Sequence, residues 1–543
     1  MMNRLQYSRR EMLNLTGKAV AVGMLGPAFC FAGKESSVNS FGAVVGEPVA
    51  AKIGEAILSD GGNAIDAAIA TAFAAGITSP SKCGLGGYGG HAIIALANGK
   101  ITAIDFNSAA PAKAREERFP LDEKGRVKGN LNYHGWLAAA VPGTPAGLQL
   151  ALERYGTRSL RDVLAPTIRL CEECVSVPSE TKTQAALDAS RDNPTPESAR
   201  SRAHVETRKN TKLAQLFKTL AERNSVESFY RGDIAQKIAD AFQTNGGLVT
   251  VEDMAAYRAR EMKPLKLDWN GLTIHTAPLT SPGLMMLEAM SILKSLGWAK
   301  LSARERLQAK LEALRIAWAD RAQFFGDPEK VKVPVEKLLS SARAHEMKTK
   351  VQLAVKESRP VPLKIDSFDD EGTINISAVD RHGNMVAVTL THGSGFGARV
   401  AVEEFGMVLG HGMWRFDPRP GRPNSPGPGK RAVNNMCPTV VTRGGKPVLA
   451  IGGAGGTRIP NSVFEVLINY VGLGASMDDA MKAPRLQTTG TLKLGMEKGH
   501  SSEDQEFLKK IGYKISTTPG AYVSAVCFDL KFKSARGASS GGI

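Results

Sequence analysis

Two β-branched runs joined by a short polar loop constrain the fold of this chain more than any other feature. Residues 373–380 and 385–391 are rich in branched and apolar residues, and 381–383 (RHG) lie between them. A three-residue loop with glycine in the left-handed position is a common hairpin connection. Counting outward from this loop, Thr373 is predicted to face Thr391 across the two strands, with Cβ atoms roughly 5 Å apart.

Two opposed threonines have a simple interpretation and a functional one. The simple one is a β-branched pair that stabilises a sheet. In the functional one, the Gly372–Thr373 bond breaks itself: the Thr373 hydroxyl attacks the Gly372 carbonyl, the acyl group shifts from nitrogen to oxygen, and water releases it. Thr373 then begins a new chain, and its α-amine, with an unperturbed pKa of about 8, can act as base for its own hydroxyl. Thr391 would hold that hydroxyl in place.

A family resemblance favours the functional interpretation. Residues 373–380 (TINISAVD), 383–384 (GN) and 396–397 (FG) resemble the start of the small subunit of the gamma-glutamyltransferases, self-cleaving enzymes of the N-terminal-nucleophile class. The resemblance covers nearly the whole chain after its N-terminal segment. Further matching motifs are 60–66 (DGGNAID), 84–90 (GLGGYGG), 110–114 (APAKA), 141–147 (VPGTPAG), 245–248 (NGGL), 326–328 (GDP), 436–439 (MCPT) and 452–458 (GGAGGTR).

The resemblance implies a fold, a division of the chain and a mechanism. The implied fold is an α/β (α+β) four-layer αββα sandwich, with a large subunit over 34–372 and a small one over 373–543. The implied chemistry is acyl transfer from Thr373, with the backbone N–H groups of Gly455 and Gly456 as the oxyanion hole. The alternative for that glycine pair is a tight turn. No metal or organic cofactor is implied.

The positions that bind substrate in the family differ here. Asn107 replaces an arginine that clamps the α-carboxylate of the substrate, and Arg415 replaces an aspartate that binds its amine. The family's paired serines near the oxyanion appear as Asn434 and Asn435, whose amides can still donate. Two further positions differ close to the nucleophile: Asn375 replaces a histidine, and Gly393 replaces an asparagine that contacts substrate.

These differences leave three hypotheses about function. The first is an amidohydrolase or acyltransferase that acts on a small, anionic acyl group, with Arg415 as the carboxylate clamp and water or an amine as acceptor. The second is a true γ-glutamyl hydrolase or transpeptidase. The third is a catalytically inactive binding protein. Arg415 has its own alternatives, a solvated surface charge or an ion pair with Asp417.

Composition narrows the class of partners. The 69 Lys and Arg against 53 Asp and Glu give a formal charge of +16, which favours acidic small molecules. The chain lacks a stripe of alternating basic and aromatic residues, and it lacks zinc-finger spacing, so nucleic acid is not an expected partner. The dinucleotide-like pattern Gly84, Gly86, Gly89 precedes a predicted strand rather than a helix, so we expect close packing of a loop instead of cofactor binding.

The first 33 residues predict export. Arg9 and Arg10 precede an apolar run over 19–32, which is typical of a twin-arginine signal and too short for a stable anchor. The expected location is periplasmic, with no stable membrane anchor after signal removal, and lipid attachment at Cys30 is disfavoured by a poor lipobox. Cys171 and Cys174 have redox or metal spacing, but no second Cys or His pair accompanies them. At i, i+3 on a predicted helix the two thiols share one face, so packing is the preferred explanation, and their redox state stays open.

The remaining pattern predicts alternating helices and strands. Expected helical regions are 48–59, 63–77, 229–257 and 304–325, and expected strands include 91–96, 101–106 and 272–278. Residues 180–225 are polar, without apolar periodicity, and predict a surface excursion or a partly mobile helical hairpin. Residues 332–370 predict weak structure ending in an exposed acidic linker.

Overall fold

Two six-stranded antiparallel sheets form the centre of the protein. The computed structural model describes residues 40–173, 175–178, 205–363 and 372–540. In sheet one the order is β1-β9-β10-β2-β3-β6, and in sheet two it is β19-β18-β14-β13-β8-β7. The strands of sheet one are β1 (Gly42–Val45), β9 (Ile374–Asp380), β10 (Met385–Thr391), β2 (Gly89–Ala95), β3 (Ile101–Asp105) and β6 (Arg260–Met262). Those of sheet two are β19 (Ser534–Ser540), β18 (Tyr522–Asp529), β14 (Lys446–Ala454), β13 (Thr439–Arg443), β8 (Leu272–Thr276) and β7 (Leu265–Trp269).

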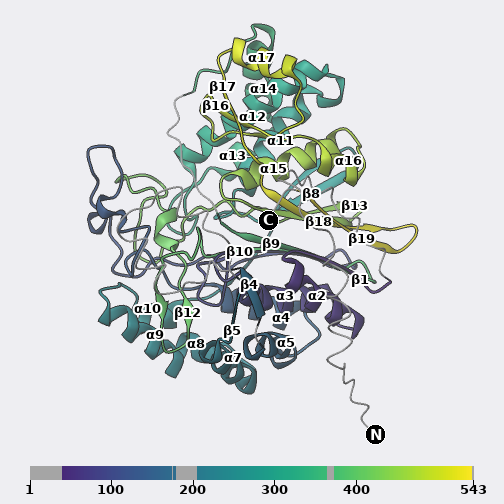
Figure 1. Ribbon diagram of the computed structural model, residues 1–543. Helices are drawn as coiled ribbons and strands as arrows, with labels where there is room; N and C mark the ends of the chain where they lie inside the picture. The colour runs from purple at the N-terminus through teal and green to yellow at the C-terminus, as the bar shows by residue number, and fades with distance from the viewer. Residues whose placement is uncertain (1–39, 174, 179–204, 364–371, 541–543) are drawn as a thin grey trace, which may run out of the picture. The chain divides into compact units, whose positions relative to one another are not determined.

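Three separate hydrophobic cores show that the sheets lie in a four-layer sandwich. One core joins sheet one to its covering helices, a second joins sheet two to another helical layer, and a third lies between the sheets. The middle core contains Val379 and Met385 from sheet one with Ala450 and Val526 from sheet two. Figure 1 shows the helical layers below and above the paired sheets. The predicted αββα architecture is therefore confirmed.

The helices divide between the two outer layers. Those packed on sheet one are α2 (Pro48–Ser59), α3 (Ala64–Thr78), α4 (Thr144–Tyr155), α5 (Leu160–Glu172), α7 (Thr211–Arg223), α8 (Glu227–Arg231), α9 (Asp233–Thr244) and α10 (Val251–Ala256). Those packed on sheet two are α11 (Gly283–Leu296), α12 (Ala303–Phe324), α13 (Val335–Leu338), α14 (Ser341–Lys356), α15 (Arg458–Leu467) and α16 (Met477–Lys482). A further helix, α17 (Ser502–Lys510), packs beside the small sheet of β15 (Leu486–Gln487), β16 (Lys493–Met496) and β17 (Lys514–Thr517).

The predicted hairpin is confirmed in its strands, loop and register. Val379 pairs with Met385 and Ile374 with Leu390, and Gly383 has a φ of 85°. Along β9, Ile374 and Ile376 face the helices while the residues between them face sheet two, as the two-residue period of a strand requires. Thr373 therefore begins the strand on the side that faces sheet two.

Both sheets contain strands from before and after the predicted cut at Gly372. Sheet one takes β9 and β10 from the later part, and sheet two takes β7 and β8 from the earlier part. A chain cut at this point would keep its two pieces hydrogen-bonded through both sheets.

Two predictions of weak structure are wrong. Helix α7 lies within the stretch predicted to lack apolar periodicity, and it buries Leu213, Leu216, Phe217 and Leu220 in the core of sheet one. Their helical spacing was hidden by the polar residues around them. Helices α13 and α14 likewise occupy part of 332–370, although the acidic linker at 364–371 lies outside the described residues.

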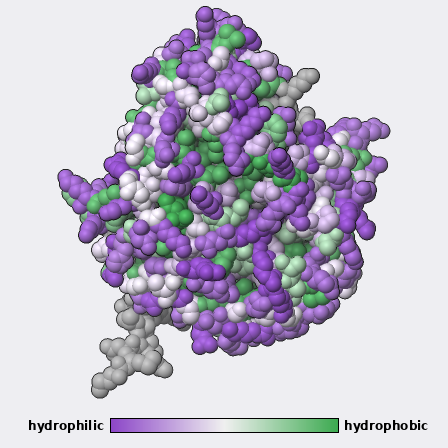
Figure 2. Space-filling model, turned by 180° about the vertical axis from the view of Figure 1, so that it is seen from behind, coloured by the Kyte–Doolittle hydropathy of each residue, from purple (hydrophilic) through white to green (hydrophobic). Residues whose placement is uncertain are grey.

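The remaining sequence predictions concern the cysteines and the surface. Helix α5 ends at Glu172, and Cys171 is a buried free thiol. The prediction that Cys171 and Cys174 share a helix face involves Cys174, which lies outside the described residues, as Cys30 does. Within the described ranges, no helix is both long enough and apolar enough to cross a membrane. Figure 2 shows a face covered mainly by hydrophilic residues, with hydrophobic residues grouped near its centre.

Candidate active site

The two threonines meet at one end of the hairpin. Thr373 and Thr391 are both buried, and the Thr373 hydroxyl donates to Thr391 Oγ1 over 3.4 Å. This distance is longer than the typical ~2.7–2.8 Å between hydroxyl oxygens. Thr391 Oγ1 also accepts the N–H of Gly393 at 2.7 Å, which fixes its position. The predicted neighbours are thus brought together, with Thr391 held more firmly than Thr373.

The backbone at the predicted cleavage site is strained. Gly372 has a φ of 100°, and Thr373 has a φ of 148°, which a β-branched residue rarely adopts. A Cβ at position 372 would lie 2.1 Å from the carbonyl oxygen of Gly393, so only glycine fits there. Strain of this kind costs about 1–3 kcal/mol per residue and concentrates at functional sites. The bond predicted to break is therefore destabilised in the intact chain.

The glycine pair lies at the same end of the sandwich as Thr373. Asn375, two residues into the hairpin, lies against Gly452 of β14, because a Cβ added there would be 2.1 Å from Asn375 Oδ1. Further along β9, Ser377 contacts Ser524 and Val379 shares the middle core with Ala450. The contacts run in opposite directions along β9 and β14, so the strand start at Thr373 lies toward Gly455, which follows β14.

The N–H groups of this pair suit an oxyanion hole. Gly455 and Gly456 have φ values of 135° and 61° and directly precede α15. Their carbonyls accept the N–H groups of Arg458 and Ile459, while no acceptor in the described part of the chain takes their own N–H groups. At a helix N-terminus such groups are unsatisfied and carry partial positive charge. They can therefore stabilise a negative oxygen.

A buried histidine fixes the loop that follows Thr391. His411 Nε2 accepts the N–H of Ser394 at 2.9 Å, and its Nδ1 lies 3.2 Å from the carbonyl oxygen of Tyr133. Burial lowers the pKa of His411 to about 3, so the ring is neutral, with the proton on Nδ1. A Cβ at Gly393 would lie 1.9 Å from His411 Nε2. The ring thus occupies the space that any larger side chain at position 393 would need.

Arg415 belongs to a cluster of cationic and polar side chains close to the threonines. Its charge lowers the pKa of Tyr88 against the rise caused by burial, and it lowers the pKa of Arg321 of α12 in addition to the effect of burial, so all three side chains lie near one another. Tyr88 adjoins Gly89, which pairs with Thr391 in sheet one. The predicted alternative partner, Asp417, instead forms an ion pair with Arg419 at 2.7 Å.

Of the three predicted asparagines, only Asn435 joins this cluster through its side chain. Its Oδ1 accepts from Arg321 at 2.9 Å. The Asn434 amide lies 2.7 Å from buried His91, and the Asn107 amide donates to Thr280 Oγ1 and to the Ala432 carbonyl. Both amides are engaged inside the protein, so substrate binding by Asn107 and Asn434 stays a prediction that their hydrogen bonds do not support. We call Tyr88, Arg321, Arg415 and Asn435 the recognition cluster.

Sequence reasoning missed Arg321 and His411. Arg321 is an ordinary helix residue by pattern, five residues before the 326–328 motif, and that proximity is the only local signal. His411 carries no signal except its flanking glycines, Gly410 and Gly412. Both act through partners far away in the sequence.

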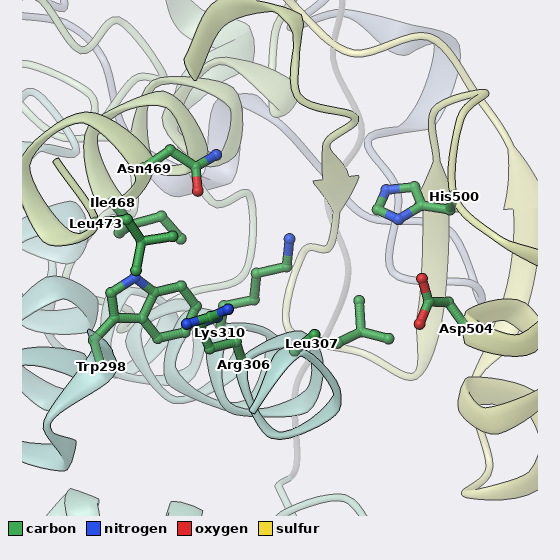
Figure 3. A pocket seen from close by; sticks show the side chains of 10 residues that line it. Trp298, Arg306, Leu307, Lys310, Ile468, Asn469, Leu473, His500 and Asp504 are labelled. Atoms are coloured by element: carbon green, nitrogen blue, oxygen red, sulfur yellow. The ribbon is translucent and has the colours of Figure 1, made fainter. Parts of the chain in front are cut away.

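The cavity shown in Figure 3 is separate from these groups. It measures about 200 Å³ and lies between α12, the end of α15 and the segment around His500. Trp298 and Lys310 line it, and the Lys310 ammonium is paired with buried Glu465 at 2.7 Å. None of its lining residues belongs to the hairpin, the glycine pair or the recognition cluster.

Comparisons with known proteins agree with this geometry. Residues 50–539 match the family model described as gamma-glutamyltranspeptidase. The chain is 34% identical over 494 residues to the glutathione hydrolase proenzyme of Escherichia coli (strain K12), covering 87% of this chain and 85% of that protein. It is 32% identical over 503 residues to the acylase ACY 1 proenzyme of Pseudomonas sp. (strain V22), covering 90% and 89%. The structure matches the cephalosporin acylase of Bacillus halodurans with a TM-score of 0.83 at 26% identity, covering 95% of this chain and 98% of that one.

Proposed function

Because the chain belongs to the gamma-glutamyltranspeptidase family, we propose that it is a self-processing amidohydrolase or acyltransferase with Thr373 as nucleophile. The observation that carries the proposal is the strained Gly372–Thr373 junction, whose hydroxyl contacts a firmly held Thr391. Two of the relatives described above are proenzymes by name, which supports a precursor cut into two chains.

Processing would follow from this junction. The Thr373 hydroxyl attacks the Gly372 carbonyl, the C–N bond breaks, and the nitrogen takes the hydroxyl proton to become a free α-amine. Water then hydrolyses the ester, so Gly372 ends one chain and Thr373 begins the other. Relief of the φ strain at Thr373 favours the cleaved state.

Turnover would use the same groups on an external amide. The α-amine of Thr373 takes the hydroxyl proton as Oγ1 attacks the carbonyl carbon, and the N–H groups of Gly455 and Gly456 stabilise the oxyanion. The proton passes to the leaving amine as the C–N bond breaks. Water or an amine then attacks the acyl-enzyme and regenerates the hydroxyl. Each oxyanion donor contributes about 3–4 kcal/mol in comparable sites.

The recognition cluster supports a small acyl group that carries a negative charge. Arg415 stands where the family has an acceptor for an ammonium group, and it lies beside a second cation, Arg321. A carboxylate is attracted to this pair, and an ammonium group is repelled. A charge-assisted contact of this kind contributes about 1.5–3 kcal/mol.

A second candidate is hydrolysis of γ-glutamyl amides. It is favoured by the 34% identity to the Escherichia coli protein, whose name is glutathione hydrolase proenzyme. The engaged amide of Asn107, at the position of the family's carboxylate clamp, and the charge of Arg415 speak against it.

One substrate panel distinguishes these candidates. We expect the processed protein to release p-nitroaniline faster from an N-acyl anilide that carries a terminal carboxylate than from γ-glutamyl-p-nitroanilide. A faster γ-glutamyl rate that is unaffected by Arg415→Ala would overturn the anionic-acyl proposal. No turnover of any anilide, with one band at full length on a denaturing gel, would favour the inactive binding protein.

We extend the proposal to location on the basis of residues 1–33, whose paired arginines and apolar run support export to the periplasm. Fractionation of cells that produce the full chain tests this, and replacement of Arg9 and Arg10 by lysine should retain the protein in the cytoplasm.

A further inference from the structure

The cavity of Figure 3 is lined by two side chains with buried polar atoms that lack partners. These atoms are Trp298 Nε1 and His500 Nε2, and neither has a hydrogen-bond partner in the described part of the chain. Leaving a buried polar atom unpaired is unfavourable, so proteins rarely do it without a reason such as a bound ligand or water. Two such atoms on the walls of one cavity indicate that a bound molecule completes them.

One side of this cavity presents hydrogen-bond donors. They are the indole N–H of Trp298 in η4 (Trp298–Lys300), the guanidinium of Arg306 and the ammonium of Lys310, both from the first turns of α12. The Arg306 guanidinium lies 6.0 Å from the centroid of the Trp298 ring, and no carboxylate in the described ranges forms an ion pair with it. The Lys310 ammonium is already neutralised by Glu465 at 2.7 Å. This side therefore suits an anionic group, with Arg306 as the charge that it would neutralise.

The opposite side presents acceptors. Figure 3 shows His500 and Asp504 across the cavity from Trp298. Burial lowers the pKa of His500, and the charge of Lys310 lowers it further, so the ring is neutral and Nε2 can accept a hydrogen bond. The Asp504 carboxylate forms no ion pair or hydrogen bond with any residue that the structure describes. This side therefore suits a cationic group.

The walls between the two sides are mainly apolar, and the cavity is small. Leu307 and Leu473 line it, and after α15 the chain continues as a π-helical turn, η6 (Ile468–Gly472), which places Ile468 and Asn469 on the wall. Such turns are rare and often lie at functional sites. The volume of about 200 Å³ is far more than one water needs, about 10–15 Å³, and less than the 300–1,000 Å³ or so typical of pockets for drug-sized ligands. It suits a ligand of a few carbon atoms.

We propose that this cavity binds a small α-amino acid with an apolar side chain, its carboxylate toward Arg306 and its ammonium toward Asp504. The Trp298 N–H and His500 Nε2 complete the hydrogen bonds of the two charged groups, and the side chain packs against Leu307. A simple carboxylate would leave Asp504 without a counter-charge, and a simple amine would leave Arg306 without one. Because the cavity shares no residue with the hairpin, the glycine pair or the recognition cluster, binding here does not depend on the proposed reaction.

Three ligands of similar shape test the two charges on the wild-type protein. L-valine carries both charges, isovalerate lacks the ammonium group, and isobutylamine lacks the carboxylate. In isothermal titration calorimetry of the mature protein, we expect L-valine to bind roughly tenfold more tightly, or better, than either analogue. No saturable binding of L-valine at about 10 mM, or equal affinity for L-valine and one of the analogues, would overturn the proposal.

Two substitutions test whether the ligand lies in this cavity. Arg306→Met should weaken the binding of both L-valine and isovalerate by roughly tenfold, because both carry the carboxylate. Asp504→Asn should weaken L-valine by roughly tenfold and leave isovalerate within about twofold, because only L-valine carries the ammonium group. L-valine affinity that is unchanged in both variants would place the ligand elsewhere and overturn the proposal.

Two neighbouring residues provide matched controls. Arg304 on α12 and Glu503 on α17 are exposed, pair with each other and do not line the cavity. Arg304→Met and Glu503→Gln should therefore leave both affinities as in the wild type. Melting temperatures without ligand show whether each variant is folded, and the comparison of the three ligands on the wild type needs no variant.

Discussion

The reaction end and the recognition cluster of this site obtain their function in different ways. The reaction end, namely Gly372, Thr373, Thr391, Gly455 and Gly456, uses hydroxyls and backbone N–H groups positioned by strand register and glycine conformation. The recognition cluster uses side chains from four segments of the chain that meet through long-range packing. By the resemblance described above, the reaction end keeps the residues of the family, and we propose that the recognition cluster replaces an acceptor of cations with a donor to anions.

The proposed function implies that a fold can change substrate without changing chemistry. Acyl transfer requires a nucleophile, a base and oxyanion donors, and the residues proposed for these roles lie in backbone-defined positions. The choice of acyl group depends on charges that can be exchanged without disturbing those positions. Four changes test the comparison, in order of expected effect.

Thr373→Ala should abolish anilide hydrolysis, because it removes the nucleophile itself. We expect at least a ~10⁴-fold loss of kcat, as in other covalent catalysts that lose theirs. Release of p-nitroaniline measures this, with Thr373→Ser as the control that keeps a hydroxyl and should retain activity. An alanine variant with wild-type turnover would place the nucleophile elsewhere.

Gly372→Ala should slow processing by roughly 10–100-fold. The added Cβ collides with the Gly393 carbonyl oxygen at 2.1 Å, and the φ of 100° strains any other residue by about 1–2 kcal/mol. A time course on denaturing gels gives the rate. Gly395→Ala is the matched control, because no atom lies within 4 Å of the Cβ it adds. Equal processing of the two variants would show that the junction is not constrained as described.

Arg415→Ala should lower kcat/KM for a carboxylate-bearing anilide by roughly 10–100-fold while sparing a neutral one, since about 1.5–3 kcal/mol of charge-assisted binding is lost. Steady-state kinetics measures the ratio of kcat/KM for the glutaryl anilide to kcat/KM for the butyryl anilide. Arg419→Ala removes a neighbouring guanidinium that is already paired with Asp417, so the ratio of the two kcat/KM values should stay as in the wild type. An equal loss of kcat/KM on both substrates would show that Arg415 acts in the reaction itself and not only in binding the acyl group.

Glu288→Gln should have the smallest effect of the four changes. It should alter the stability of the protein and leave the reaction end and the recognition cluster unchanged. Burial, with Asp320 beside it, raises the pKa of Glu288 well above its usual 4.5, so the folded protein holds a proton that the unfolded chain releases. Stability from this group is therefore present below pH 4.5 and lost as pH rises toward the folded pKa. Glutamine is always neutral, so we expect it to gain about 1–2 kcal/mol over the wild type at pH 8.

Melting temperatures at pH 5 and pH 8 test that stability change. The gain from Glu288→Gln should be larger at pH 8. Glu346→Gln is the control, because Glu346 is exposed and pairs at 3.2 Å with Arg343, the arginine that also lies 3.8 Å from Glu288. A gain that is equal at both pH values would mean that Glu288 is ionised in the folded protein.

The sequence predicted the features that depend on local pattern. The hairpin register followed from a loop length and a two-residue period, and helices α2 and α3 lie in the regions 48–59 and 63–77 that were expected to be helical. Helix α7 was missed because polar residues on either side concealed its apolar spacing.

Parts of the site escaped prediction because they depend on packing between distant segments. Arg321 meets Asn435 across 114 residues of sequence, and His411 bonds to Tyr133 across 278. The engagement of the Asn107 amide by Thr280 and Ala432 is likewise a long-range result. Contacts between residues so far apart in the sequence cannot be predicted from a local sequence pattern.

The N-terminal sequence of the smaller fragment of the mature protein tests the central claim most directly. The proposed self-cleavage predicts two fragments on a denaturing gel, with the smaller one beginning Thr373-Ile374-Asn375. An unbroken chain, or a small fragment that begins at any other residue, would contradict it.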